Sequence, residues 1–358
     1  MANRQVLSKL IKSVPIAVPS ITIPALYIQQ RRLSHHYPAL AMKIACVTSW
    51  GSPPEYMSGP DLPAPSPTQL QLKVLAVGVP RVVQARAARK HPSAFNAQLP
   101  FDPSIDGVGL DEATGDLYFI NPLAASLLAE RVNVERIQLM KLEPGTDPII
   151  VAGLANPVSS SWMALRCRAI GGCQGRNVVI VGATSASGRA AATVARSLGA
   201  SRIIGISRSE DTLAAVEGLD DRVILQDPFV MPKHIGPVHI VLDYVGGPVA
   251  VGILQTAEVE AGENLQYIQV GGLASQETHM LQLLPTHLIS LRPICIMGSG
   301  VGSFSKQDLL KEMPGLVSTI SKMKKPPIDI FPAPLSEVQS AWESEEAQKK
   351  RLVLLPNL

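Results

Sequence analysis

A turn between an apolar run and an alanine-rich stretch carries the strongest pattern for chemistry. The apolar run 178–181 leads into residues 182–188, after which alanine dominates. The first N–H groups of a helix lack partners inside the helix, and the helix dipole favours negative charge there, so such a strand–turn–helix unit can hold a pyrophosphate. We expect the ligand to contact the small residues of this turn, namely Gly182, Thr184, Ser185, Ala186, Ser187 and Gly188. The alternative is a structural tight turn that binds nothing.

The turn departs from the dinucleotide-binding fingerprint G-x-G-x-x-G. Ala183 and Ser185 occupy the first two glycine positions, and only Gly188 is in register. The turn instead follows a looser G-x-x-S-x-x-G pattern that begins at Gly182. The strand before the turn and the helix after it still favour a nucleotide site.

The end of the next apolar run indicates which nicotinamide cofactor would bind. Ser207 stands where an acidic residue would hold the ribose hydroxyls, and Arg208 follows it. A hydroxyl and a guanidinium can hydrogen-bond a 2′-phosphate, which an acidic residue would repel. The pattern therefore favours NADPH over NADH, with a solvated surface position as the alternative for Arg208.

Composition limits the class of protein. The chain has 358 residues, of which 46% are hydrophobic and 17% charged, enough for two domains with sizeable cores. Its four cysteines show no C-x-x-C spacing, which argues against a disulfide scaffold or a zinc ribbon and favours a reducing compartment. The longest apolar runs are broken by glycine, proline or charge before the roughly 18 residues that a membrane span needs, so we expect a soluble protein.

Charge is unevenly distributed between the start of the chain and the rest. Residues 1–41 hold five basic residues and no acidic one, whereas the remaining 27 basic and 29 acidic residues give a net charge of −2. A body so balanced gives no electrostatic reason to expect a nucleic-acid partner. We interpret residues 1–41 as a disordered tail or an extension of the gene model, which predicts a cytoplasmic protein. A mitochondrial targeting segment is the alternative, although its prolines would break the helix that import requires.

The pattern along the chain predicts an α/β fold with two domains. Residues 42–158 contain short β-like runs and turns, and the proline-rich segment 53–67 is expected to be a surface connection. A helix is predicted after about residue 148, with the serines 159–161 able to cap it. Residues 159–293 alternate strands and helices, and their strands are apolar throughout, as a doubly wound parallel sheet covered on both faces requires. From 294 to 358 the β-like pattern returns.

Several short motifs in this order resemble the medium-chain dehydrogenase/reductase superfamily, and within it the zinc-free quinone oxidoreductase branch. The resemblance extends from Met42 to Leu358. Besides the glycine turn, its motifs are Asp106-Gly107-Val108-Gly109, Asn156-Pro157, Leu242-Asp243-Tyr244-Val245-Gly246, Gln269-Val270-Gly271-Gly272 and Lys350-Arg351-Leu352-Val353.

The resemblance implies a Rossmann domain, residues 159–293, and a discontinuous GroES-like catalytic domain built from residues 42–158 and 294–358. It implies hydride transfer from NADPH to a quinone or an activated C=C bond of a small hydrophobic substrate. It also implies a homodimer, which the edge-like run 291–300 could mediate. Zinc-dependent relatives carry a His-Glu pair where this chain has Ser104-Ile105-Asp106, so no metal site is expected.

Within this resemblance, particular residues acquire expected roles. Asn156, at a strand-to-helix junction, would face the nicotinamide carboxamide, or would cap a helix instead. Val270, Gly271 and Gly272 would let the ring lie against backbone, and Gly298-Ser299-Gly300 would border the cofactor. Tyr244 lies at a strand's carboxyl end, where parallel sheets bind ligands, and is the candidate proton donor, with cofactor lining or packing as the alternative. Asp243 is expected to be a structural hydrogen-bond acceptor, and His91 to lie on the surface or to reach the cleft.

Two other functions stay open. The chain resembles, more distantly, stand-alone enoyl reductases of polyketide-type pathways, whose substrate is tethered to a carrier domain. A basic patch at the cleft mouth would favour that function, and Arg81, Arg86, Arg89 and Lys90 are its only suggestion. The third possibility is a non-catalytic reductase-like protein, which side chains filling the phosphate site would support.

Overall fold

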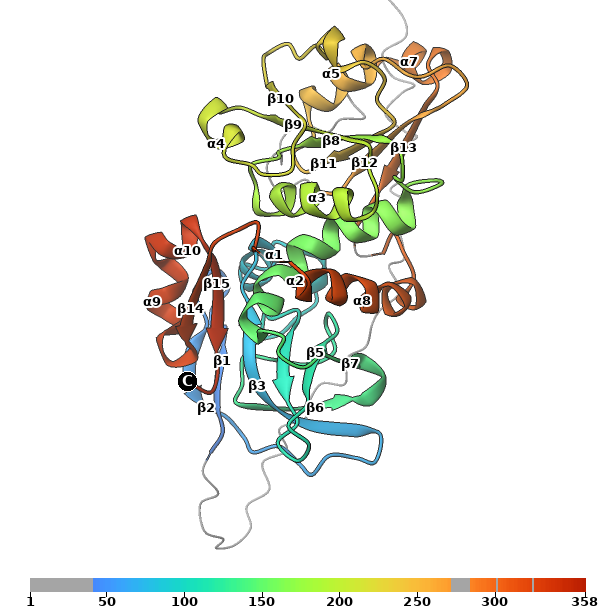
Figure 1. The fold of residues 1–358 in the computed structure, drawn as a ribbon. Helices are drawn as coiled ribbons and strands as arrows, with labels where there is room; N and C mark the ends of the chain where they lie inside the picture. Colours follow the sequence, from blue (N-terminus) through green and yellow to red (C-terminus); the bar gives the residue numbers. More distant parts are fainter. Residues whose placement is uncertain (1–40, 272–283, 301, 324) are drawn as a thin grey trace, which may run out of the picture. The chain divides into compact units, whose positions relative to one another are not determined.

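Runs of consecutive apolar residues form a parallel sheet of six strands in the computed structural model, which describes residues 41–271, 284–300, 302–323 and 325–358 (Figure 1). The strand order is β10-β9-β8-β11-β12-β13, and every neighbouring pair is parallel. The chain passes from β8 to β9 on one side and later returns to β11 on the other, which is the doubly wound Rossmann order. The strands are β8 (Asn177–Val181), β9 (Arg202–Ser207), β10 (Asp221–Ile224), β11 (Ile240–Asp243), β12 (Leu265–Gln269) and β13 (Ile294–Gly298).

Both faces of this sheet are covered, which explains why its strands are apolar at every position. On one face, Val178 and Ile180 of β8 belong to a buried cluster shared with α3 (Ala186–Ser197). On the other, Val179 and Val181 belong to a cluster shared with α5 (Pro248–Thr256). Successive strand residues point to opposite faces, so a strand covered on both sides needs no polar alternation. Two further α-helices among the described residues of this region are α4 (Glu210–Ala214) and α7 (Thr286–Leu291).

A second sheet of seven strands is mainly antiparallel and joins distant parts of the chain. Its order is β14-β15-β3-β4-β5-β7, with β6 paired to β3. In Figure 1 the C-terminal strands β14 and β15, in red, lie beside the blue strand β3, and β15 pairs with β3 antiparallel. The strands are β3 (Gln69–Gly78), β4 (Gly107–Leu110), β5 (Leu117–Ile120), β6 (Arg131–Glu135), β7 (Leu139–Lys141), β14 (Ile330–Pro334) and β15 (Arg351–Leu355), and a separate pair is β1 (Lys43–Cys46) with β2 (Glu55–Ser58).

Short helices accompany this second sheet. The first is α1 (Arg81–Ala87), which begins just after β3 and buries Val83 and Ala87. Near the C-terminus, α9 (Val338–Glu343) and α10 (Glu345–Lys349) precede β15, and Val338 and Ala341 join the buried cluster that includes β3.

Helix α2 (Pro148–Met163) packs against both sheets' elements. Asp147 caps it by accepting hydrogen bonds from the N–H groups of Ile149 and Ile150, at 2.8 and 3.4 Å. It contacts β3 on one side and α3 on the other, and a second long helix, α8 (Lys306–Ser321), lies against it. The serines 159–161, expected to cap a helix, instead lie inside α2 and donate to carbonyls three residues earlier. Asn156 likewise lies within the helix and not at a strand-to-helix junction.

The stretch 148–168 passes a length and composition test for a membrane span, since five π-helical residues extend α2. However, 67% of the 18-residue window that passes this test is buried inside the protein. Burial of this extent is typical of the core helix of a globular domain, which passes the same test. Residues 1–40 lie outside the described residues, so the expectations about a tail or a targeting segment are untested.

Two sequence-based expectations differ from the structure. Strand β13 (Ile294–Gly298) completes the parallel sheet, although the return to the β-rich domain was expected at residue 294. The proline-rich segment 53–67 contains β2 (Glu55–Ser58), which pairs with β1 between the prolines. In both cases the deciding factor is a pairing partner, β12 for β13 and β1 for β2.

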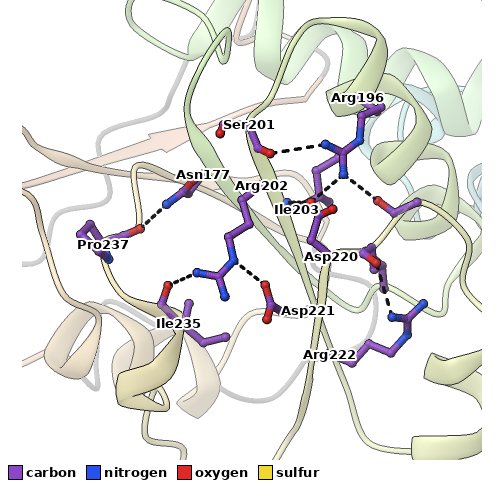
Figure 2. Close-up of polar contacts among 12 residues, drawn as sticks. Asn177, Arg196, Ser201, Arg202, Ile203, Asp220, Asp221, Arg222, Ile235 and Pro237 are labelled. Carbon is purple, nitrogen blue, oxygen red and sulfur yellow. Dashed lines mark hydrogen bonds and ion pairs between the residues drawn. The ribbon is translucent and has the colours of Figure 1, made fainter.

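A network of charged side chains fastens the β9–β10 edge of the parallel sheet (Figure 2). Arg202 Nε donates to Asp221 Oδ2 at 2.5 Å, and Arg196 Nη2 donates to Asp220 Oδ2 at 2.6 Å. The same Asp220 oxygen accepts from the N–H of Ile203 at 2.7 Å, so it ties helix α3 to the beginning of β9. Asp220, Asp221 and Arg202 lie at the ends of β9 and β10 where these strands begin, opposite to the ends where ligands bind in such sheets.

Substituting Gly188 should disrupt the junction of β8 and α3. A Cβ atom there would lie 2.3 Å from the Gly182 carbonyl oxygen and 2.7 Å from the Ala183 Cα. We expect Gly188→Ala to lower the free energy of unfolding by about 1–3 kcal/mol, because backbone must move to admit the methyl group. Chemical denaturation would measure this.

Gly298→Ala is the matched control, since a Cβ there meets no atom within 4 Å. Equal denaturation midpoints for Gly188→Ala and the wild type would contradict the close packing of α3 on β8.

Candidate functional site

One large cavity, with a volume of about 1330 Å³, is bounded by both sheets' elements. Residues 184–187 of the β8–α3 turn, Tyr244, Val270, Gly271, Ser299 and Gly300 line it from the parallel-sheet side. Arg81, His91, Asp106 and Arg351 line it from the β-rich side, and Asn156, Ser159, Ser160 and Met163 of α2 lie between. The volume exceeds that of ordinary small-ligand pockets, roughly 300–1000 Å³, so a ligand of dinucleotide size has room.

The β8–α3 turn presents backbone N–H groups to the cavity. Gly182 has φ +81°, a conformation that favours glycine. Ser185 caps α3, because its Oγ accepts from the Gly188 N–H at 3.0 Å and donates to the Gly182 carbonyl at 2.8 Å. The N–H groups of Ala186 and Ser187, on the cavity wall, have no partner among the described residues. The serine that replaces a glycine therefore folds onto the turn and leaves the first helical N–H groups to the cavity.

The residues expected to select the cofactor lie beside this turn. Thr184 Oγ1 is 2.9 Å from Ser207 Oγ at the end of β9. Arg208 is exposed and forms none of the hydrogen bonds or ion pairs found among the described residues. Arg189, on the cavity wall, donates to the Thr184 carbonyl at 3.1 Å. Ser207 and Arg208 do not line the cavity themselves.

Asp243 holds the loop after β11, which ends on the cavity wall. Its Oδ1 accepts from the N–H groups of Val245 and Gly246 at 2.6 and 2.8 Å, and its Oδ2 accepts from the Tyr267 hydroxyl. Burial raises the pKa of Asp243, and these three donors oppose that rise. The expectation that Asp243 is a structural acceptor is confirmed.

The same network extends to Gly271. Tyr267 OH lies 2.9 Å from Gln269 Oε1, and Gln269 Nε2 donates to the Gly271 carbonyl. A Cβ on Gly271 would lie 2.9 Å from the Tyr244 carbonyl oxygen, so this loop approaches its neighbour as closely as backbone allows. Val270 and Gly271 both line the cavity. Gly272 lies outside the described residues.

Tyr244 is a poor candidate for proton transfer. Its hydroxyl is 3.4 Å from Ser160 Oγ of α2, and burial raises its pKa to about 12. A phenol with this pKa releases a proton less readily than an ordinary tyrosine. The position of Tyr244 agrees better with lining the cavity. Asn156, on the same wall, makes no side-chain hydrogen bond within the described parts of the chain.

The loop after β13 joins the parallel-sheet side of the wall. The Ser299 N–H donates to the Gln269 carbonyl at 2.8 Å, and Arg168 Nε donates to the Gly298 carbonyl at 2.9 Å. Ser299 and Gly300 line the cavity, whereas Gly298, Gly182 and Gly188 lie behind its wall.

Two further residues on the cavity wall, Asp106 and Arg351, have no role that the sequence predicted. Asp106 is 3% exposed and Arg351 stands at the start of β15, 245 positions away, so only the fold brings them together. His91 was expected either on the surface or in the cleft. It lines the cavity, and its Nδ1 lies 2.9 Å from Ser93 Oγ. Burial, and secondarily the charge of Arg86, lower the pKa of His91.

The basic residues that could have formed a docking patch for a carrier domain, Arg81, Arg86, Arg89 and Lys90, are dispersed. Arg86 is 5% exposed and donates to the Pro103 carbonyl at 2.8 Å. Arg89 lies over the Trp50 ring and donates to the Phe95 carbonyl. Lys325 and Lys350, which line the cavity, are paired with Glu217 and Glu346. Among the described residues no group of three or more His, Cys, Asp or Glu side chains could hold a metal ion, and the four cysteines are free.

Solved structures share the fold of this chain. The quinone oxidoreductase from Thermus thermophilus, solved also in complex with NADPH, is 22% identical, with a TM-score of 0.69 over 88% of this chain and 100% of that one. An NAD-dependent alcohol dehydrogenase is 18% identical, with a TM-score of 0.69 over 88% and 99%. The fold is therefore that of two-domain nicotinamide-dependent oxidoreductases.

A sequence relative narrows this class. A probable NADPH-dependent quinone reductase, tdiC, from Emericella nidulans is 51% identical over 88% of this chain and 100% of its own length. No family model matches the chain. The chain belongs to the quinone oxidoreductase-like branch of the medium-chain dehydrogenase/reductase superfamily, as the sequence motifs indicated.

Removing the Tyr267 hydroxyl should loosen the loop at Tyr244 and Gly271. Tyr267→Phe takes one of three donors from the buried Asp243 carboxylate, so we expect the free energy of unfolding to fall by about 1–3 kcal/mol at neutral pH. Chemical denaturation provides the measurement.

Tyr56→Phe is the matched control, because Tyr56 is 36% exposed and its hydroxyl bonds to no described residue. If both variants unfolded at the wild-type midpoint, the Asp243 hydrogen bonds would not contribute to the free energy of unfolding.

Proposed function

We propose that this protein is an NADPH-dependent quinone reductase. The observation that carries the proposal is the cavity that joins an anion-binding turn to a wall with polar groups on the β-rich side. The relative that is 51% identical, a probable NADPH-dependent quinone reductase, supports it. A quinone or an activated C=C bond of a small hydrophobic molecule is the substrate class.

The residues on the cavity wall fit a bound dinucleotide. The N–H groups of Ala186 and Ser187 would hold the pyrophosphate, with Ser185 shaping the turn around it. Tyr244, Val270 and Gly271 would lie along the nicotinamide, and the Asn156 amide would bind its carboxamide. NADPH, when bound, supplies a hydride to the substrate. The chain's own task is then to align the reactants, exclude water and provide a proton.

Ser207 and Arg208 would select NADPH. Ser207 is held by Thr184, and Arg208 is free to reach a 2′-phosphate. We expect Arg208→Ala to weaken NADPH binding about ten-fold and to leave NADH binding unchanged, since a lost charge-assisted hydrogen bond is worth about 1.5 kcal/mol. Fluorescence titration of the full chain with each nucleotide would measure both affinities.

Arg136→Ala is the matched control, because Arg136 is also exposed and makes no side-chain bond with a described residue. Equal loss of NADPH and NADH affinity in Arg208→Ala would argue against 2′-phosphate recognition.

A direct assay tests the reaction. The full chain should oxidise NADPH when a small quinone such as 1,4-benzoquinone or an enone is added, and the rate should survive treatment with EDTA. The second condition follows because zinc-independent chemistry is proposed. NADPH oxidation followed by absorbance is the measurement. Tight NADPH binding without turnover of any quinone or enone would favour the non-catalytic alternative.

The alternatives have less support. A protein with a closed phosphate site would lack a cavity of dinucleotide size, and the β8–α3 turn here faces such a cavity. A carrier-tethered substrate would favour an unpaired basic patch, whereas the cationic side chains around the cavity include several that are ion-paired or buried. We further propose a homodimer that pairs through β13, which is an edge strand of the parallel sheet.

A further inference from the structure

Asp106 occupies an unusual place on the cavity wall. It directly precedes β4, is 3% exposed, and lines the cavity. Its carboxyl group accepts no hydrogen bond from any described residue, whereas the carboxylate of Asp243, also buried, accepts three. A buried carboxylate without donors is unfavourable, so such a group either binds a proton or meets a ligand.

The charged neighbours of Asp106 are arginines. Arg351, from β15, lines the same wall and donates from Nη1 to the Val79 carbonyl at 3.1 Å, while its Nε is buried without a partner among the described residues. Arg351 forms no ion pair with Asp106, but the positive charge of Arg351 acts to lower the pKa of Asp106. The charge of Arg81, at the start of α1, acts in the same direction on the pKa of Arg351. His91, from the segment after α1, lines the same cavity.

Burial favours the protonated form of this carboxyl group. Burial raises the pKa of Asp106 to about 7, and the positive charge of Arg351 limits that rise. Arg351 stays charged, since burial lowers its pKa only to about 10. The neutral acid is therefore the main form below about pH 7, and the positive charge of Arg351 favours the carboxylate that remains after proton loss.

The fold connects Asp106 to the expected nicotinamide wall through α2. Val77 of β3 pairs with Gly107, and continuing that register places Asp106 beside Gly78. A Cβ on Gly78 would lie 2.2 Å from the Ala152 carbonyl oxygen, so this point touches α2. Asn156 follows one helical turn later, and Ser160, the neighbour of Tyr244, one turn after that. Asp106 thus lies on the β-rich side of the same wall, about two to three helical turns from Tyr244.

We propose that Asp106 is the general acid of the proposed quinone reduction: its Oδ–H group donates a hydrogen bond to an oxygen of the bound quinone and transfers its proton to that oxygen. This role rests on the proposed function. It names the proton source that neither Tyr244 nor Asn156 provides.

The step balances. The quinone gains two electrons and one hydrogen as the hydride from the cofactor, and one proton from Asp106, to give the hydroquinone. The O–H bond of Asp106 breaks as the O–H bond on the quinone oxygen forms, and Arg351 stabilises the carboxylate that remains. A solvent proton then restores the acid through the cavity. The direction is favourable because a phenol has a pKa of about 10, above that of Asp106.

The activity test compares Asp106→Asn with the wild type in the full chain, using NADPH and 1,4-benzoquinone. We expect kcat to fall about 100-fold or more, as loss of a general acid does, while NADPH affinity by fluorescence is unchanged. The wild-type kcat should decrease as pH rises through about 7, because the acid form is lost, and the variant should lack this decrease. Asp106→Glu, which keeps a carboxyl group, should recover part of the rate.

Asp111→Asn is the matched control. Asp111 also belongs to the β4–β5 hairpin and is 8% exposed, but it bonds to Ala113 and Thr114 in the turn and does not line the cavity. It should retain the wild-type pH profile.

A second measurement does not depend on turnover. The infrared spectrum of the wild type at pH 6 should contain a protonated-carboxyl band that is lost at about pH 8.5 and is missing from Asp106→Asn, because the two pH values lie on either side of the pKa of about 7. A carboxyl group already ionised at pH 6 would overturn the proposal, as would wild-type turnover by Asp106→Asn. If that variant fails to fold, a wild-type kcat that is flat across the same pH range would overturn it. A wild type that reduces no quinone would instead refute the proposed function itself.

Discussion

The cavity depends on the close approach of β3 to α2. A Cβ on Gly78 would lie 2.2 Å from the Ala152 carbonyl oxygen, so the strand and the helix meet backbone to backbone. On its other side, α2 packs against α3, the helix that follows the β8–α3 turn. Glu312 of α8 fixes the end of α2 by accepting from Trp162 Nε1 and Arg166 Nε, each at 2.9 Å. One helix therefore relates the two halves of the wall, and interiors packed this closely transmit small displacements.

Two buried aspartates show how environment separates structural from chemical roles. Asp243 accepts hydrogen bonds from three donors and so holds its loop in place. Asp106 accepts none from the described residues, lines the cavity, and is influenced electrostatically by Arg351. Burial raises the pKa of both, but hydrogen bonding offsets the rise only at Asp243. Asp243 therefore holds a loop in place, whereas in our proposal Asp106 donates a proton.

Local patterns in the sequence predicted the parallel sheet and its turn because their signals are local. An apolar run, a small-residue turn and an alanine-rich helix follow one another between 178 and 197, so the β8–α3 unit could be identified without knowing its neighbours. The role of Asp243 followed from its place at a strand end. Asn156 was expected at a strand-to-helix junction, but it lies inside α2, which accommodates Pro157 and is capped by Asp147. Residues 294–298 were assigned to the β-rich domain but form β13 of the parallel sheet, because the sequence of an edge strand does not indicate which sheet it joins.

The residues missed on the β-rich wall required non-local information. Asp106 and Arg351 line the same cavity because β15, which begins at Arg351, returns to pair with β3. An alcohol dehydrogenase and a quinone oxidoreductase share this fold at equal TM-scores, so the fold alone does not decide the reaction. What distinguishes this chain is the wall itself: on one side the β8–α3 turn, and on the other a buried carboxyl group that accepts no hydrogen bond from the described residues and feels the charge of Arg351. In our proposals the turn holds the cofactor's pyrophosphate, and the carboxyl group supplies the proton that completes reduction of the hydride acceptor.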